Sequence, residues 1–257
     1  MKYFLKITFL FLIVISVSCS PARIYTTGSY GSLKSYSEKQ HYIGRKTTET
    51  YVSGDLSIGK HPQEAATFND KKTVTAINVH RNTTGRRYNF YYGLGVAFGT
   101  YKFTEGYQDL IRNGEKSKFF AVNLKSGINY TYTRPKVDWR FVGFEVAYLN
   151  ESGAYQDKLN KLSLVEDEDL YVANQKSMFT YQFYSEYVFK ISDEEAFTIG
   201  FYVGDLINRK LANIYDVDTS FNGFTIGLRL KKYTISSIFE TGQGDIQSTK
   251  IGLTYKL

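Results

Sequence analysis

Alternation of large apolar residues with a period of two is the feature that most constrains this chain. From Tyr51 to Leu257 the sequence contains ten stretches of this kind, each bounded by polar or glycine-containing turns, and no helical period competes with them. Successive side chains of a β-strand point to opposite faces, so the period predicts strands with one apolar face. The clearest stretch has Tyr88, Phe90, Tyr92, Leu94, Val96 and Phe98 on one face and Tyr91, Gly93, Gly95, Ala97 and Gly99 on the other.

The connections between these stretches alternate in length. Long connections cover residues 60–71, 104–118, 150–176 and 205–219, with a shorter one at 242–245. Tight turns lie between them at residues 82–85, 134–136, 192–194 and 231–232. Long loops on one rim and short turns on the other, with the termini on the short-turn side, are typical of transmembrane barrels. The sequence therefore predicts an all-β fold, an antiparallel up-and-down transmembrane β-barrel of about ten strands, over residues 49–257.

Alternation by itself fits two kinds of barrel, because a soluble lipocalin-like carrier would turn its apolar face inward around a ligand. Two details favour the membrane. The second face is rich in Gly and Ala, which suits a crowded lumen, and tyrosines recur toward the ends of the apolar rows, where membrane barrels have aromatic girdles. These tyrosines are Tyr88, Tyr130, Tyr132, Tyr148, Tyr233 and Tyr255.

On these features the segment Tyr51–Leu257 resembles, in its architecture, the small outer-membrane β-barrel proteins of Gram-negative bacteria. The resemblance implies a location in the outer membrane, with membrane lipid as the partner of the apolar face. No motif of a particular family accompanies it, and the final Leu257 differs from the terminal Phe that is common in such proteins.

The N-terminus predicts export. Residues 1–18 combine two lysines, an apolar run from Ile7 to Ile15 and small residues before Cys19, which is the order of a secretory signal peptide. The run is too short to cross a bilayer, which takes about 20 residues. The residues before Cys19 resemble a bacterial lipobox, which implies lipidation of Cys19; the alternative is an ordinary cysteine near a conventional cleavage site. Residues 19–48 lack a clear period and predict a periplasmic tether.

Eight charged residues fall on the rows that would face the lumen. They are Asp55, Glu145, Glu186 and Glu240 with Lys125, Arg229, Lys250 and Lys256. Buried charges must be paired to offset the loss of hydration, so this equal balance predicts a network that fills the lumen. A conducting pore would need a wider barrel, since aqueous channels belong to barrels of about 16 or more strands.

The longest connection, residues 150–176, is the most individual segment of the chain. It contains an apolar cluster and then an acidic run: Leu159, Leu162, Leu164 and Val165, followed by Glu166, Asp167, Glu168 and Asp169. Loops of this length are usually functional or disordered. The apolar cluster is expected to dock on the barrel mouth or on a protein partner. The acidic run is expected to be solvated, with Ca²⁺ or a basic partner as alternatives.

No catalytic arrangement stands out. The three histidines are His41, His61 and His80. They have neither metal-binding nor triad spacing, so we expect no enzyme activity, no cofactor and no metal. One alternative is an omptin-like enzyme, in which a histidine and an aspartate of the outer rim activate a water. The residues of that alternative are His61 with Asp205, Asp216 or Asp218.

The favoured interpretation is an outer-membrane barrel with a structural, adhesion or assembly role through its extracellular loops. Without the two lysines of residues 1–18 the formal net charge falls from +7 to +5, which is too modest to indicate nucleic acid as a partner, and export makes that partner less plausible still. A protein partner is expected at residues 150–176. The omptin-like enzyme and the lipocalin-like periplasmic carrier of an apolar ligand stay open as alternatives.

Overall fold

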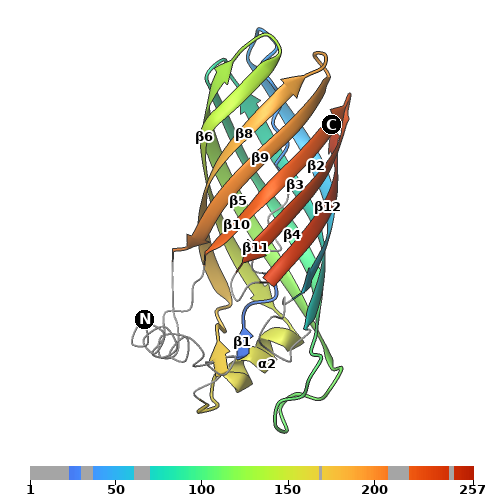
Figure 1. Cartoon of the computed structure of the whole chain (residues 1–257), viewed down its shortest axis with the longest axis vertical. Coiled ribbons are helices and arrows are strands. Elements are labelled where there is room, and N and C mark those ends of the chain that lie inside the picture. Colours follow the sequence, from blue (N-terminus) through green and yellow to red (C-terminus); the bar gives the residue numbers. More distant parts are fainter. Residues whose placement is uncertain (1–22, 30–36, 61–69, 168–169, 208–219, 243–245) are drawn as a thin grey trace, which may run out of the picture.

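The computed structural model forms one closed antiparallel barrel of ten strands (Figure 1). The structure describes residues 23–29, 37–60, 70–167, 170–207, 220–242 and 246–257. The barrel strands are β2 (Thr47–Lys60), β3 (Lys71–Thr84), β4 (Tyr88–Lys102), β5 (Lys116–Thr133), β6 (Val137–Ser152), β8 (Ser177–Lys190), β9 (Glu195–Leu206), β10 (Phe221–Leu230), β11 (Tyr233–Gly242) and β12 (Ile246–Lys256). Three short elements complete the fold: β1 (Arg23–Tyr25), β7 (Leu170–Val172) and helix α2 (Ala154–Leu162).

Neighbours in the barrel follow the order of the chain, and the last strand closes against the first. Each strand pairs antiparallel with the next, and β12 pairs with β2, where Ile251 lies opposite Leu56. Closure gives every wall strand a partner on both sides, which a sheet in hydrocarbon requires. The predicted all-β, up-and-down barrel is confirmed. Within the described ranges, no helix is long and apolar enough to cross a membrane.

The outer surface of the wall is apolar. Leu94 and Ile251 have exposed fractions of 56% and 60%, and they belong to a band that runs around the barrel. Further members of the band are Leu56, Ile77, Phe98, Leu124, Ile128, Phe179, Phe183, Phe201, Val203, Ile235, Phe239 and Leu253. Soluble monomers do not expose apolar patches of this extent, whereas the outward face of an outer-membrane barrel is such a band. The chain is therefore an outer-membrane-type β-barrel. The alternative prediction, a soluble carrier with its apolar face turned inward, is wrong.

Aromatic rings form a belt where the band meets the tight-turn rim. The ring pairs are Tyr88 with Tyr130 at 5.3 Å, Tyr233 with Tyr255 at 5.1 Å, and Trp139 stacked on Tyr187 at 5.4 Å between centroids. Two cations lie beyond this belt, with the Arg134 guanidinium 4.8 Å from the Tyr132 ring and the Lys232 amine 5.7 Å from the Tyr255 ring. Such rings occupy the headgroup level of a bilayer, so the belt marks one edge of the membrane.

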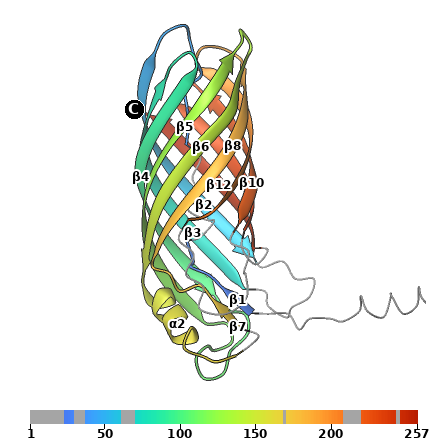
Figure 2. The same cartoon turned by 90° about the vertical axis from the view of Figure 1, so that its left-hand side faces the viewer.

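The two rims of the barrel differ. The tight turns and the C-terminus lie at the upper rim in Figure 1, and the described connections β4–β5 and β6–β8 lie at the lower rim together with α2, β1 and β7 (Figures 1 and 2). Strands β4, β5 and β6 have 15, 18 and 16 residues. About 9–11 tilted residues cross a bilayer, so these strands continue past the membrane and support the elements at the long-loop rim.

Helix α2 was not predicted; it lies in the long connection at residues 150–176 and interrupts none of the barrel strands. The helix follows Gly153, whose φ is 116°, and a Cβ there would lie 2.9 Å from the carbonyl oxygen of Lys118. Only glycine suits that combination of backbone angle and close approach. The buried side of α2, including Tyr155, Leu159 and Leu162, packs into an apolar core at the long-loop rim. The other members of this core near the helix include Tyr25, Tyr101, Phe103, Phe119, Ile111 and Leu170.

Inside the wall, aromatic rings lie over glycines of the neighbouring strand. Tyr91 is the register partner of Gly127, where a Cβ would stand 2.3 Å from the ring, and Tyr184 covers Gly143 in the same way at 2.1 Å. Three further pairs are Phe119 with Gly99, Tyr202 with Gly223, and Phe221 with Gly204. The glycine-rich lumen rows thus leave the space that these inward rings occupy.

Candidate functional site

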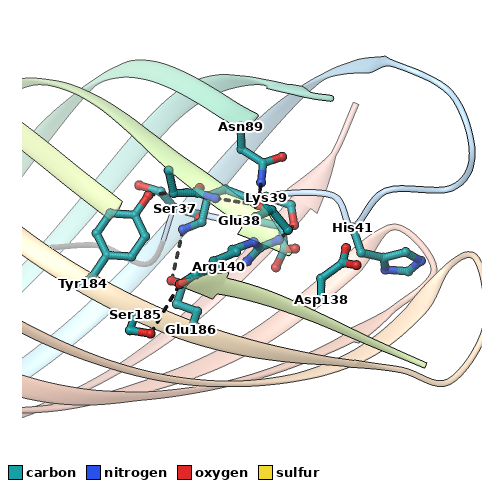
Figure 3. A network of polar contacts seen from close by, with 12 residues as sticks. Ser37, Glu38, Lys39, His41, Asn89, Asp138, Arg140, Tyr184, Ser185 and Glu186 are labelled. Atoms are coloured by element: carbon teal, nitrogen blue, oxygen red, sulfur yellow. Dashed lines mark hydrogen bonds and ion pairs between the residues drawn. The ribbon is translucent and has the colours of Figure 1, made fainter. Parts of the chain in front are cut away.

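The chain N-terminal to the barrel occupies the lumen. Residues 37–41, which we call the lumen segment, lie inside the wall, and their exposed fractions range from 2% to 5% (Figure 3). Residues 19–48 were predicted to be a periplasmic tether. Within that range, residues 37–41 are packed inside the lumen, where the side chains of Glu38, Lys39 and Gln40 have hydrogen-bond partners on the wall.

Three charged side chains form the centre of the site. The Lys39 amine lies 3.1 Å from one carboxylate oxygen of Glu186, and the Arg140 guanidinium lies 2.8 Å from the other. Arg140 also donates to the backbone carbonyl of Lys39. The Lys39 amine lies 4.8 Å from the centre of the Tyr184 ring and 5.2 Å from that of Tyr91, distances at which a ring face attracts a cation. Wall and lumen segment therefore share one ion-pair group (Figure 3).

A second group forms around Arg229 on β10. Its guanidinium lies 3.2 Å from the Glu38 carboxylate and 3.1 Å from the side-chain oxygen of Gln40, and it also contacts His41. The backbone carbonyl of Glu38 accepts a hydrogen bond from Nε2 of His80 at 2.9 Å. A carbonyl cannot donate, so this contact places a proton on Nε2. The lumen segment is thus held on two sides of the wall by charges of opposite sign.

The segment leaves the lumen at the tight-turn rim. The backbone N–H of Tyr42 donates to the Asp138 carboxylate at 3.0 Å, and the amine of Lys190 lies 2.6 Å from the same carboxylate. Thr84 donates its hydroxyl to the carbonyl of Gln40 at 2.9 Å. These contacts lead directly into β2, which begins at Thr47.

Residues 23–29 lie at the opposite, long-loop rim. Strand β1 pairs in parallel with β7, and the N–H groups of Gly28 and Ser29 donate to the two oxygens of the Glu151 carboxylate at 3.1 and 2.7 Å. The hydroxyl of Tyr155 on α2 donates to the carbonyl of Thr26 at 2.9 Å. The same stretch of chain therefore has one part at the long-loop rim and the next described part inside the barrel.

Seven of the eight lumen charges named from the sequence are buried: Asp55, Lys125, Glu145, Glu186, Arg229, Glu240 and Lys250. Glu145 accepts hydrogen bonds from Tyr91 at 2.6 Å and from Gln182 at 2.7 Å, and Glu240 accepts one from Tyr202 at 2.6 Å. Asp55 accepts one from Asn78 at 3.0 Å.

The eighth predicted residue, Lys256, differs from the other seven. Its side chain is 20% exposed and lies 3.9 Å from Glu49 near the tight-turn rim. Lys256 belongs to neither of the groups around Glu186 and Arg229. Substitutions of this partly exposed lysine can therefore be compared with substitutions of the buried charges.

The sequence prediction missed Arg140, and a β-bulge explains why. The register of β6 shifts between Arg140 and Gly143, so that Phe141 and Val142 both point outward, with exposed fractions of 54% and 46%. Strict alternation would have put Arg140 on the same side as Val142, but its exposed fraction is 1%. Two consecutive large apolar residues inside an alternating run were the available sign of this bulge.

One cavity beside the lumen segment is small. This cavity of 20 Å³ lies between the segment and the wall, lined by Ser37, Lys39, Glu145, Tyr184 and Glu186 among others. That volume holds about one water molecule. At the tight-turn rim the lumen opens into a cleft of 820 Å³, where Arg134 and Lys136 are among the lining residues.

The predicted partner loop divides into buried and exposed parts. Leu159 and Leu162 have exposed fractions of 0% and dock on the barrel mouth, which leaves them unavailable to a partner. Leu164 is 83% exposed, Val165 is partly buried, and Glu166 is exposed. Asp167 accepts a hydrogen bond from Tyr107. Glu168 and Asp169 lie outside the described residues.

Glu115, in the β4–β5 connection, contacts this loop and has a shifted pKa. The N–H of Arg112 donates to its carboxylate at 3.0 Å, and the amine of Lys158 on α2 contacts the other oxygen. Both contacts favour the charged form and lower the pKa of Glu115 below its usual range. The pair links the β4–β5 connection to α2.

The residues of the omptin-like alternative are not brought together in the described part of the chain. His61, Asp216 and Asp218 lie outside the described residues, while Asp205 lies near the end of β9 and accepts a hydrogen bond from the N–H of Leu206. His41 and His80 are both buried in the lumen. Among the described residues, no group of His, Cys, Asp and Glu has the arrangement of a metal site.

The chain matches no protein-family model and no curated protein sequence. Solved structures of similar shape include the translocator domain of the autotransporter NalP from Neisseria meningitidis, at 10% identity and a TM-score of 0.43 over 85% of this chain and 91% of that one. An outer membrane channel from Pseudomonas putida F1 gives 8% identity and a TM-score of 0.45 over 85% and 98% of the two chains. Neisserial surface protein A gives 8% and 0.34 over 81% and 96%.

Proposed function

We propose that this chain is a non-conducting outer-membrane β-barrel with a structural, adhesion or assembly role exerted through its outer face, and that it is not an enzyme. The observation that carries the proposal is the occupied lumen. Lys39 of the lumen segment is paired with Glu186 at 3.1 Å, and the cavity beside it measures 20 Å³. A lumen filled by the chain itself supports anchoring of an outer surface rather than passage of a solute.

The elements at the long-loop rim supply that surface. Helix α2 is fixed by its buried residues to the barrel, and its solvent side presents Asp157, Lys161 and, just after the helix, Leu164. An exposed leucine on a rigid support is a suitable contact for a protein partner at residues 150–176. Membrane lipid is the proposed partner of the apolar band, and nucleic acid is not a proposed partner. Cleavage of residues 1–18 and lipidation of Cys19 belong to the same proposal.

Conductance across planar lipid bilayers tests the proposed non-conducting state. The purified wild-type barrel is expected to be electrically silent. Arg140→Ala should introduce current steps, because it removes the wall group that holds both the carbonyl of Lys39 and Glu186. Lys256→Ala serves as the control, since this partly exposed lysine lies outside the ion-pair group. Steady conductance by the wild type would overturn the proposal.

The outer role is tested with the exposed leucine. Cells that carry Leu164→Asp are expected to lose adhesion to surfaces or to other cells, or to lose assembly with envelope partners, while the amount of folded barrel stays the same. Lys136→Glu, on the opposite rim, is the matched control and should change neither. Unchanged adhesion and assembly in the Leu164 variant would argue against a role for this surface.

A further inference from the structure

The N-terminal stretch of the chain is held at both rims of the barrel. Residues 23–29 are fixed at the long-loop rim by β7, Glu151 and Tyr155. Residues 37–41 are fixed inside the lumen, and Tyr42 is fixed by Asp138 at the tight-turn rim. Chain order therefore proceeds from the long-loop rim, through the interior, to the tight-turn rim, as the positions of β1 and β2 in Figure 1 also show.

We infer that the chain threads its own barrel from the outer face to the periplasmic face, so that the chain at Arg23 enters from the outer side of the membrane. The inference rests on the proposed function for the orientation of the barrel, because long loops of bacterial barrels are extracellular and short turns are periplasmic. It reverses the expectation that this part of the chain is a tether in the periplasm.

Ion pairs with charged side chains of the wall hold the lumen segment in this position. Glu38 meets Arg229 at 3.2 Å on one side, and Lys39 meets Glu186 at 3.1 Å on the other. If the segment lay outside the barrel, the buried Arg229 would lose the Glu38 carboxylate and Glu186 would keep only Arg140, which is unfavourable in a narrow lumen. The threaded path is therefore a part of the folded barrel and not a transient occupant.

At the long-loop rim, the site where the chain enters the barrel binds the backbone of residues 28 and 29 and has no room for a side chain at Gly28. A Cβ on Gly28 would lie 2.5 Å from the ring of Phe119, so a larger residue does not fit without movement of that ring. The two N–H groups of Gly28 and Ser29 together satisfy the Glu151 carboxylate, which is itself 0% exposed. A buried carboxylate that needs two backbone donors from the incoming chain indicates a dedicated binding site for that chain.

Epitope accessibility tests the inference. One epitope is inserted at three positions in separate variants that keep Cys19: directly before Arg23, within residues 208–219 between β9 and β10, and between Lys231 and Lys232 in the tight turn. Intact cells are stained with the antibody and then stained again after the outer membrane is permeabilised. We expect the first two epitopes to be stained on intact cells and the third only after permeabilisation.

The outcomes separate the inference from the proposed function. If the epitope before Arg23 is hidden on intact cells while the one within 208–219 is stained, the threading is wrong and the outer-membrane barrel stands. If the epitope at Lys231 is the one stained on intact cells, the orientation and the inference both fail. Each variant is checked for a heat-dependent shift in gel mobility, which reports a closed barrel. Where an insertion prevents folding, a protease site of a few residues at the same position gives the same readout by cleavage on intact cells.

Discussion

Replacement of Glu186 by glutamine should be the most damaging single change in the lumen. The Glu186 carboxylate lies 3.1 Å from the amine of Lys39 and 2.8 Å from the guanidinium of Arg140, and the three side chains are 8%, 2% and 1% exposed. Glutamine keeps the shape but leaves two buried cations next to each other. Removal of one partner from a buried ion pair costs about 3–5 kcal/mol, and we expect the free energy of unfolding to fall by that amount.

The expected result depends on a coupling that can be measured. Lys39→Met leaves the pair between Arg140 and Glu186 in place, so its cost should be about 1.5–3 kcal/mol, the range for a lost hydrogen bond to a charged group. The double variant should lose less than the sum of the two, with a coupling of about 1–3 kcal/mol. Urea unfolding in lipid vesicles, followed by the fluorescence of Trp139, gives these values, and Trp139 is the one tryptophan of the chain.

Lys256→Gln is the control for this series. Lys256 is 20% exposed and 3.9 Å from Glu49, so its loss should cost no more than about 1 kcal/mol, as for other solvated pairs. A Glu186→Gln variant as stable as this control would refute the reasoning. Additivity of the Glu186 and Lys39 changes to within about 0.5 kcal/mol would refute it too, because independent sites behave in that way.

Three further changes have defined outcomes. Gly127→Val should cost about 1–3 kcal/mol in urea unfolding, since its Cβ would lie 2.3 Å from a facing tyrosine ring, whereas Gly54→Val, with open space around it, should be nearly neutral. Leu94→Arg, in the middle of the outer band, should cost about 2–4 kcal/mol in the same assay in vesicles and little in a detergent that admits water to the band. The carboxyl of Glu115 has a lowered pKa because a backbone N–H of its own turn and the amine of Lys158 stabilise its charged form. This contribution to stability is present above the usual pKa of a glutamate and is lost as the pH falls through the lowered value. Protease cleavage of the β4–β5 connection should therefore increase on acidification. The Glu115→Gln variant should no longer show this pH dependence.

Much of the wall follows from residue alternation, because a period of two maps directly onto the two faces of a strand. The inward position of Glu145, Glu186 and Arg229 follows from the same alternation. Arg140 does not, since one bulge shifts the phase of β6 and turns both Phe141 and Val142 outward. A local break in the period changes the face of every residue on one side of it.

Other parts of the fold depend on contacts between residues that are far apart in the sequence. Helix α2 has nine residues, too few for independent stability, and it forms because Leu159 and Leu162 are buried against the barrel mouth. The lumen segment has no period of its own, and Lys39 finds its partner Glu186 at a separation of 147 residues. Polar side chains without a pattern resemble a solvated tether until the wall that pairs with them is known.

The glycines that face inward rings also restrict which alignments of neighbouring strands are compatible with assembly. A slip of two residues between β4 and β5 preserves the apolar outside and polar inside, so hydrophobicity does not oppose it. The slip would, however, put Tyr91 opposite Lys125 or Asn129 in place of Gly127, where no room for a ring exists. Strand stagger sets the diameter of a barrel. The small residues therefore fix the bore of the barrel, and with it the width of the passage in which Glu38 and Lys39 find their partners.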